Sequence, residues 1–276
     1  MNVGSEEVLH NPPYKGDCEV QTRNTYCITP CKENTEAVSR LSPLTRLQEL
    51  AQEQWGLLTR RQIEAEGIGS TTVERLTAPG GSLERVASGV YLIVAAPIPD
   101  HMNLRAAWLQ LAPDVPAWKR TPEEGIVSHR SAASVYRVGH LPADQHEFTL
   151  SKRKQSRRKD VRIHVRPFQR SEWVALRGLP VTRPSRIASD LLWDREDPEA
   201  VARLISDSIR PLYDYPGTFA DCLAPHARRF GLRTGDGLGL LRWFLDLAGD
   251  PERGRWIEEA LAHIDHTQIQ HAGGLV

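Results

Sequence analysis

The sequence lacks a long apolar run and has little methionine, little cysteine and no net charge. Its 276 residues include 2 Met and 4 Cys, and 35 Lys and Arg are balanced by 35 Asp and Glu. No stretch approaches the roughly 20 apolar residues that a membrane-spanning helix needs, and the first residues carry no basic-then-apolar export signal. We therefore expect a cytoplasmic protein with no membrane partner, in which any attraction to nucleic acid comes from local clusters of charge.

The few cysteines also argue against a metal site or a disulfide framework. Cys18, Cys27 and Cys31 are not spaced as a zinc ligand set, and His10 alone lies near them as a possible fourth ligand. These residues belong to a polar, proline-containing stretch without hydrophobic period, so residues 1–40 are predicted to form a flexible arm. The rest of the chain is rich enough in apolar residues to bury a core, and no cofactor or metal is predicted.

Residues 41–96 carry the pattern of a winged helix-turn-helix. Apolar residues at helical spacing predict a first helix within 44–56, and Thr59 can cap a second short helix. After two glycines, Ser70 is predicted to cap a third helix, the candidate recognition helix. Two alternating segments, 83–86 and 90–93, then predict a hairpin that serves as the wing.

Residues 97–276 are predicted to form an α+β domain that ends in helices. Two alternating segments, 146–151 and 161–167, predict the strands of a hairpin around a basic connection. A solvated turn is the alternative to phosphate contact by this connection, and we favour phosphate contact because the block is so dense in charge. Its basic residues are Lys152, Arg153, Lys154, Arg157, Arg158 and Lys159.

Two further motifs complete a resemblance to a known family. They are SHRSAASVYRVG at residues 128–139 and GLPVTRPSRIASDLL at residues 178–192, and both follow the winged helix pattern in order. With the basic segment between them, the chain resembles the AbiEi antitoxins of type IV toxin–antitoxin and abortive-infection systems, especially actinobacterial members. The resemblance covers roughly residues 41–210.

The resemblance implies a transcriptional repressor that is also an antitoxin. In that family the N-terminal domain binds inverted repeats in its own promoter, and the C-terminal domain counteracts a nucleotidyltransferase toxin encoded beside it. The resemblance places operator contacts on the third helix and the wing, and we add two arginines at the start of the second helix. The predicted DNA-contacting residues, besides the basic segment, are Arg60, Arg61, Ser70, Thr71, Thr72, Arg75, Arg85 and Tyr91.

Two alternatives stand beside this prediction. Related architectures carry an endonuclease domain that needs clustered acids, but Asp190, Asp194, Glu196 and Asp197 surround a helix end and a helix start, where acids are common, so no enzyme is predicted. The second alternative is a toxin-binding or RNA-binding module whose winged helix mediates protein interaction instead of reading DNA. A neighbouring gene for a nucleotidyltransferase would favour the antitoxin prediction.

Overall fold

The first described segment of the chain builds a small three-stranded sheet with three short helices. The structure is a computed structural model that describes residues 43–156 and 158–273, so the predicted arm lies outside the described residues. The sheet has the strand order β1-β3-β2, and both pairs are antiparallel. In chain order the elements are α2 (Pro43–Gln52), β1 (Leu57–Thr59), α3 (Arg60–Ala65), α4 (Ser70–Leu76), β2 (Leu83–Ala87) and β3 (Val90–Ile93). This is the predicted winged helix-turn-helix, with β1 as a strand that the sequence analysis missed.

Local sequence explains where the short helices begin. Thr59 caps α3 as predicted, because its side chain accepts a hydrogen bond from the Gln62 backbone while the Gln62 side chain accepts one from the Thr59 backbone. The predicted cap of α4 is wrong by one position. Gly69 is the N-cap and contributes no side-chain bond, and Ser70 is the first helical residue. The Ser70 side chain is exposed and is left free for another contact.

A small hydrophobic core holds these elements together. Leu47 and Ala51 from α2 meet Ile63 of α3 and Val73 of α4 over the sheet residue Leu58. Burial of one such aliphatic side chain contributes about 1.5–3 kcal/mol. The inward face of α4 is thereby fixed, and the opposite face of the helix is turned to solvent.

The second part of the chain is built around a mixed five-stranded sheet. Its strand order is β6-β5-β4-β8-β7. Helices α5 (Met102–Leu111) and α6 (His129–Tyr136) contact strand β5. The strands are β4 (Ile126–Val127), β5 (His146–Leu150), β6 (Val161–Val165), β7 (Trp173–Leu176) and β8 (Leu179–Thr182). Together with the winged helix this confirms the predicted α+β class.

The predicted basic hairpin is wrong. Strands β5 and β6 exist as predicted, but they pair in parallel, with His146 opposite Val161 and Leu150 opposite Val165. The other edge of β5 pairs antiparallel with β4. The chain between β5 and β6 therefore runs back along the length of β5 instead of turning tightly. The basic residues line a long crossover segment and not the tip of a hairpin.

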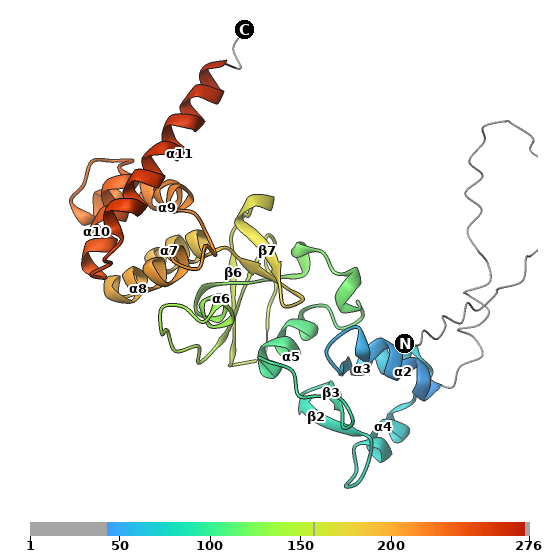
Figure 1. Ribbon diagram of the computed structural model, residues 1–276. Coiled ribbons are helices and arrows are strands. Elements are labelled where there is room, and N and C mark those ends of the chain that lie inside the picture. Colours follow the sequence, from blue (N-terminus) through green and yellow to red (C-terminus); the bar gives the residue numbers. More distant parts are fainter. Residues whose placement is uncertain (1–42, 157, 274–276) are drawn as a thin grey trace, which may run out of the picture. The chain divides into compact units, whose positions relative to one another are not determined.

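Helices complete the fold after the sheet, and Figure 1 shows them gathered into one cluster. Asp197 caps α8 as predicted, and Asp236 caps α10 by accepting a hydrogen bond from the Gly239 backbone at 2.7 Å. The helices are α7 (Pro184–Trp193), α8 (Pro198–Ile209), α9 (Pro216–Leu223), α10 (Gly237–Leu247) and α11 (Arg253–Gly273).

The winged helix and the larger sheet share hydrophobic contacts. Trp55 packs edge-on against Trp108 of α5, with the ring centroids 6.0 Å apart, and Arg105 lies 4.3 Å from the centroid of the Trp55 ring. Gly178, in the β7–β8 turn, has φ +80°, and a Cβ there would meet the Trp55 ring at 3.0 Å. The turn thus needs glycine both for its backbone and for the approach of the tryptophan. The described residues form one compact unit.

Candidate DNA-binding surface

The outward face of α4 is polar and open. Ser70, Thr71 and Arg75 are exposed, and Thr72 is half-buried. The inward residue of this helix, Val73, is in the small core. Among the described residues, Arg75 forms no ion pair and no side-chain hydrogen bond, so its guanidinium is available to a phosphate or a base edge.

The wing is a short hairpin joined to the start of α3. Gly89 lies in its turn with φ +68°, and its carbonyl accepts a hydrogen bond from the Arg60 backbone at 2.8 Å. Arg85 is exposed on β2, next to an irregularity in the β2–β3 register, and no described residue forms an ion pair with it. Tyr91 is placed differently from the sequence prediction. Only 6% of it is exposed, and it packs in the small core, so we remove it from the candidate contacts.

The two arginines at the start of α3 are exposed and already have acidic neighbours. Arg60 donates from Nε to Glu64 at 2.8 Å, and this hydrogen bond raises the pKa of its guanidinium. Arg61 lies 3.9 Å from Asp114. Exposed pairs of this kind contribute little to stability, so both side chains can exchange their partner for a phosphate.

The basic residues of the crossover segment differ in whether the protein itself bonds their side chains, and Lys154 is exposed although it is bonded. Lys152, Arg153 and Lys159 are exposed, and none of them forms an ion pair with a described residue. Lys154 donates to the Leu111 carbonyl at the end of α5. Arg158 binds Asp160, with 2.8 Å between Nε and Oδ1. Arg157 lies outside the described residues.

The side chain of Gln110 connects the crossover segment with the wing. Its amide nitrogen donates to the Ser88 carbonyl in the wing turn, and its amide oxygen accepts from Arg158. Segments that are far apart in sequence are thus held side by side by one residue of α5. The sequence analysis missed this contact because nothing in the pattern of α5 distinguishes Gln110 from any other polar helical residue.

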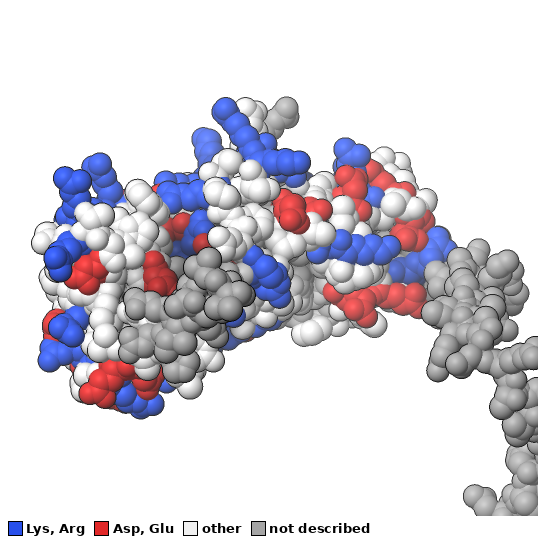
Figure 2. Space-filling model, turned by 90° about the horizontal axis from the view of Figure 1, so that it is seen from above, with Lys and Arg blue, Asp and Glu red and all other residues white. Residues whose placement is uncertain are grey.

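The charge distribution fits a local binding surface and not a uniformly basic protein. On the face shown in Figure 2, acidic and basic side chains are intermixed, and several Lys and Arg side chains project from one edge. This is the distribution expected of a chain with zero formal net charge. Phosphate binding would depend on local cations that have no acidic neighbour or that can exchange an exposed one for a phosphate.

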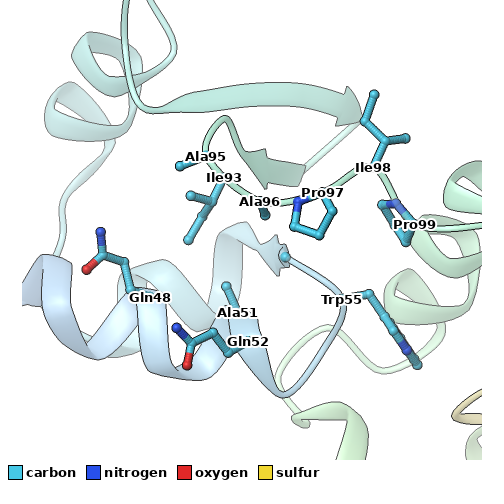
Figure 3. Close-up of a pocket in the computed structure, with 11 residues that line it drawn as sticks. Gln48, Ala51, Gln52, Trp55, Ile93, Ala95, Ala96, Pro97, Ile98 and Pro99 are labelled. Atoms are coloured by element: carbon cyan, nitrogen blue, oxygen red, sulfur yellow. The ribbon is translucent and has the colours of Figure 1, made fainter.

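A separate apolar pocket lies beside the winged helix. It has a volume of about 650 Å³ and lies between α2 and the segment after β3, with Ala51 and Trp55 on one side and Ile93, Ala96 and Pro97 on the other (Figure 3). Ile98 at its rim is 76% exposed. An apolar hollow with an exposed rim is a feature of protein-contact surfaces more than of DNA-contact surfaces.

Comparison with known proteins agrees with the geometry of the first part of the chain. A winged helix-turn-helix with an open third helix is a fold that many DNA-binding regulators use. Residues 46–94 match the family described as "Transcriptional regulator, AbiEi antitoxin". The predicted resemblance to the AbiEi antitoxins is confirmed for this segment, which spans the winged helix, and the actinobacterial type stays a prediction. No curated protein matches the chain.

The matched family is one of regulators that serve as antitoxins and is not an enzyme family. Among the described helices, none is both long enough and apolar enough to cross a membrane. The contacts of individual residues with DNA are not addressed by the match.

Proposed function

We propose that this chain is a sequence-specific transcriptional autorepressor and the antitoxin of a type IV toxin–antitoxin system. Residues 46–94 would bind inverted repeats in its own promoter, and the α+β part would counteract a nucleotidyltransferase toxin encoded beside it. The observation that carries the DNA-binding part is the polar outward face of α4, with Arg75 exposed and unpaired among the described residues. The family match at the same residues supports the regulator and antitoxin roles.

In this proposal α4 reads bases and the surrounding cations hold the backbone. Arg75 and Thr72 would reach base edges in the major groove, with Ser70 and Thr71 near the start of the helix. Arg60, Arg61, Arg85 and the exposed residues of the crossover segment would contact phosphates. The contact of Gln110 with both the wing and Arg158 supports a surface on which wing and segment act together.

The test is the binding of the full chain to its own upstream DNA and to a scrambled sequence at near-physiological salt. Arg75→Ala should lower the preference for the operator by about 1–3 kcal/mol, the range for a good base contact. Arg203→Ala is the matched control, because Arg203 is also an exposed helical arginine, on α8, with Glu199 as its neighbour. An equal loss on both DNAs would assign Arg75 to the phosphate backbone, and no loss on either would reject the role of α4.

One observation favours a second candidate function, a module whose winged helix binds a protein or an RNA. The apolar pocket between α2 and the segment after β3 is a surface that DNA does not need. If the chain fails to retain its upstream DNA selectively, co-purification with the product of the neighbouring gene becomes the deciding experiment. Rescue of growth on co-expression with that gene, by a chain that binds no DNA, would establish the antitoxin role independently.

A further inference from the structure

Three potential metal ligands meet in the larger part of the fold, away from the winged helix. His129 begins α6, His164 lies on β6 and Asp194 follows α7. His129 Nε2 lies 4.0 Å from Asp194 Oδ2, and His164 Nδ1 lies 3.9 Å from the same oxygen. All three ligand atoms are within 4.8 Å of one another. The residues are far apart in sequence, so no spacing motif could reveal them.

Each histidine is oriented by a second residue through its other ring nitrogen. Glu147 Oε1 lies 3.2 Å from His164 Nε2, and Ser128 Oγ lies 2.9 Å from His129 Nδ1. The contact of Nε2 with the Glu147 carboxylate leaves Nδ1 of His164 on the side of Asp194. In many metal sites a carboxylate orients a histidine ligand in this way, by binding the ring nitrogen that does not contact the metal.

His129 supplies an independent observation that points to a ligand. Its side chain is fully buried, and its Nε2 has no hydrogen-bond partner in the structure. A buried polar atom without a partner costs about 1–3 kcal/mol. The backbone of His129 also has φ +51°, a conformation that non-glycine residues keep mainly where the surroundings impose it.

We propose that His129, His164 and Asp194 bind one divalent ion of the zinc class. Two imidazole nitrogens and one carboxylate oxygen suit Zn²⁺, whereas Mg²⁺ and Ca²⁺ prefer oxygen ligands alone. Ligand atoms of a tetrahedral zinc ion lie about 3.3 Å apart, given bonds of about 2.0–2.1 Å. The observed separations of 3.9 and 4.0 Å therefore require the three side chains to move inward by about half an ångström.

The surroundings define what must move when such an ion binds. A cavity of about 400 Å³ borders one side of the cluster, where Glu147, Arg162 and Asp194 line it. Arg162 Nη2 contacts Asp194 Oδ2 at 3.1 Å and would share that carboxylate with the ion. The two imidazole rings are stacked, with centroids 3.5 Å apart and planes inclined by 13°. A metal ion bound by both imidazoles lies in the plane of each ring. One of the two rings would therefore have to rotate out of this stack.

The experiment is titration of the metal-free full chain with Zn²⁺ and with Co²⁺ as a spectroscopic probe. We expect one equivalent to bind, with Co²⁺ bands of a low-coordinate nitrogen and oxygen site. His164→Gln and Asp194→Asn should each weaken this binding at least 100-fold, and Glu147→Gln should weaken it about 10- to 100-fold through the orientation of His164. His226→Gln is the matched control, since His226 is also buried but bonds to Ser189 outside the cluster.

Three results would overturn the proposal. They are no binding to the wild-type chain, binding that the three variants leave unchanged, and a Co²⁺ spectrum dominated by thiolate charge transfer, which would place the ion on cysteines. The wild-type spectrum tests the ligand set even if a variant does not fold. Thermal unfolding provides a second readout, because Zn²⁺ should raise the Tm of the wild-type chain and of His226→Gln but not of His164→Gln.

Discussion

The exposed cations of the crossover segment should set the salt dependence of DNA binding. Lys152, Arg153 and Lys159 are exposed and have no acidic neighbour among the described residues, whereas Lys154 and Arg158 are bonded to Leu111 and Asp160. A side chain that is held by a bond within the protein is less able to reach a phosphate, so it displaces fewer counterions from the DNA. We therefore expect the first three to carry most of the effect of this segment.

The magnitude follows from the number of phosphates that they can neutralise. Each phosphate contact contributes about 0.9 to the slope of log K against log salt, so the triple alanine variant of these residues should flatten the slope by up to about 2.7. Between 50 and 200 mM salt this corresponds to about a 40-fold smaller loss of affinity than in the wild-type chain. The weakening should be the same for the operator and for scrambled DNA, because phosphate contacts carry no sequence information.

The assay is fluorescence anisotropy with labelled operator DNA over a series of salt concentrations. Lys154→Ala is the control within the segment, and it should change the slope much less than the triple variant. An unchanged slope in the triple variant would refute a phosphate-binding role for this segment. A slope that Lys154→Ala changes as strongly would refute the distinction between anchored and free cations.

Two further predictions concern stability. Gln62→Leu should lower the free energy of unfolding by about 2–3 kcal/mol in urea denaturation, because it removes the partner of the buried Gln54 amide, at 2.7 Å, and of the Thr59 backbone N–H, at 2.9 Å. A change below about 0.5 kcal/mol would contradict this. Burial, with Arg229 and Arg166, lowers the pKa of His226 to about 4. The unfolded chain then binds a proton that the folded chain does not, so stability falls as the pH drops from about 6.5 toward 4. Between pH 6.5 and about 5, the free energy of unfolding of His226→Gln should therefore fall by about 1.5 kcal/mol less than that of the wild-type chain, as measured by urea denaturation at each pH. An unchanged pH dependence would contradict the lowered pKa of His226.

The structural features that depend on only a few neighbouring residues, such as helix caps and tight turns, were predicted most successfully from the sequence. The caps Thr59 and Asp197 and the tight wing turn each depend on neighbours in the chain. One helix cap was predicted wrongly. Ser70 was predicted as the N-cap of α4 because of its hydroxyl group, whereas the N-cap is the preceding residue, Gly69. Both residues are common N-caps, and the sequence does not distinguish them.

The parallel pairing of β5 with β6 could not be predicted from such local sequence patterns. Two alternating segments with a short polar connection predict a hairpin, but the connection has ten residues from 151 to 160. A strand of five residues spans about 17 Å, and ten residues can span about 33 Å, so the chain can return along the strand without a helix. The antiparallel edge of β5 is used by β4, and β6 takes the remaining edge in parallel. The choice between these arrangements is a property of the whole sheet.

The distribution of ion pairs explains why a chain without net charge can still offer a phosphate-binding surface. Arg162, Arg166 and Arg186 each contact carboxylates inside the larger part of the fold, where they neutralise the acids that accumulate around the end of α7. Among the described residues, the cations without such partners include Arg75 on α4 and Arg85 on the wing, but also Arg195 just after α7. Formal charge counts paired and unpaired cations equally, whereas an exposed cation without an acidic neighbour is more available to a phosphate. The proposed DNA-binding surface is therefore expected where such cations lie beside the outward face of α4, a coincidence that only the folded structure reveals.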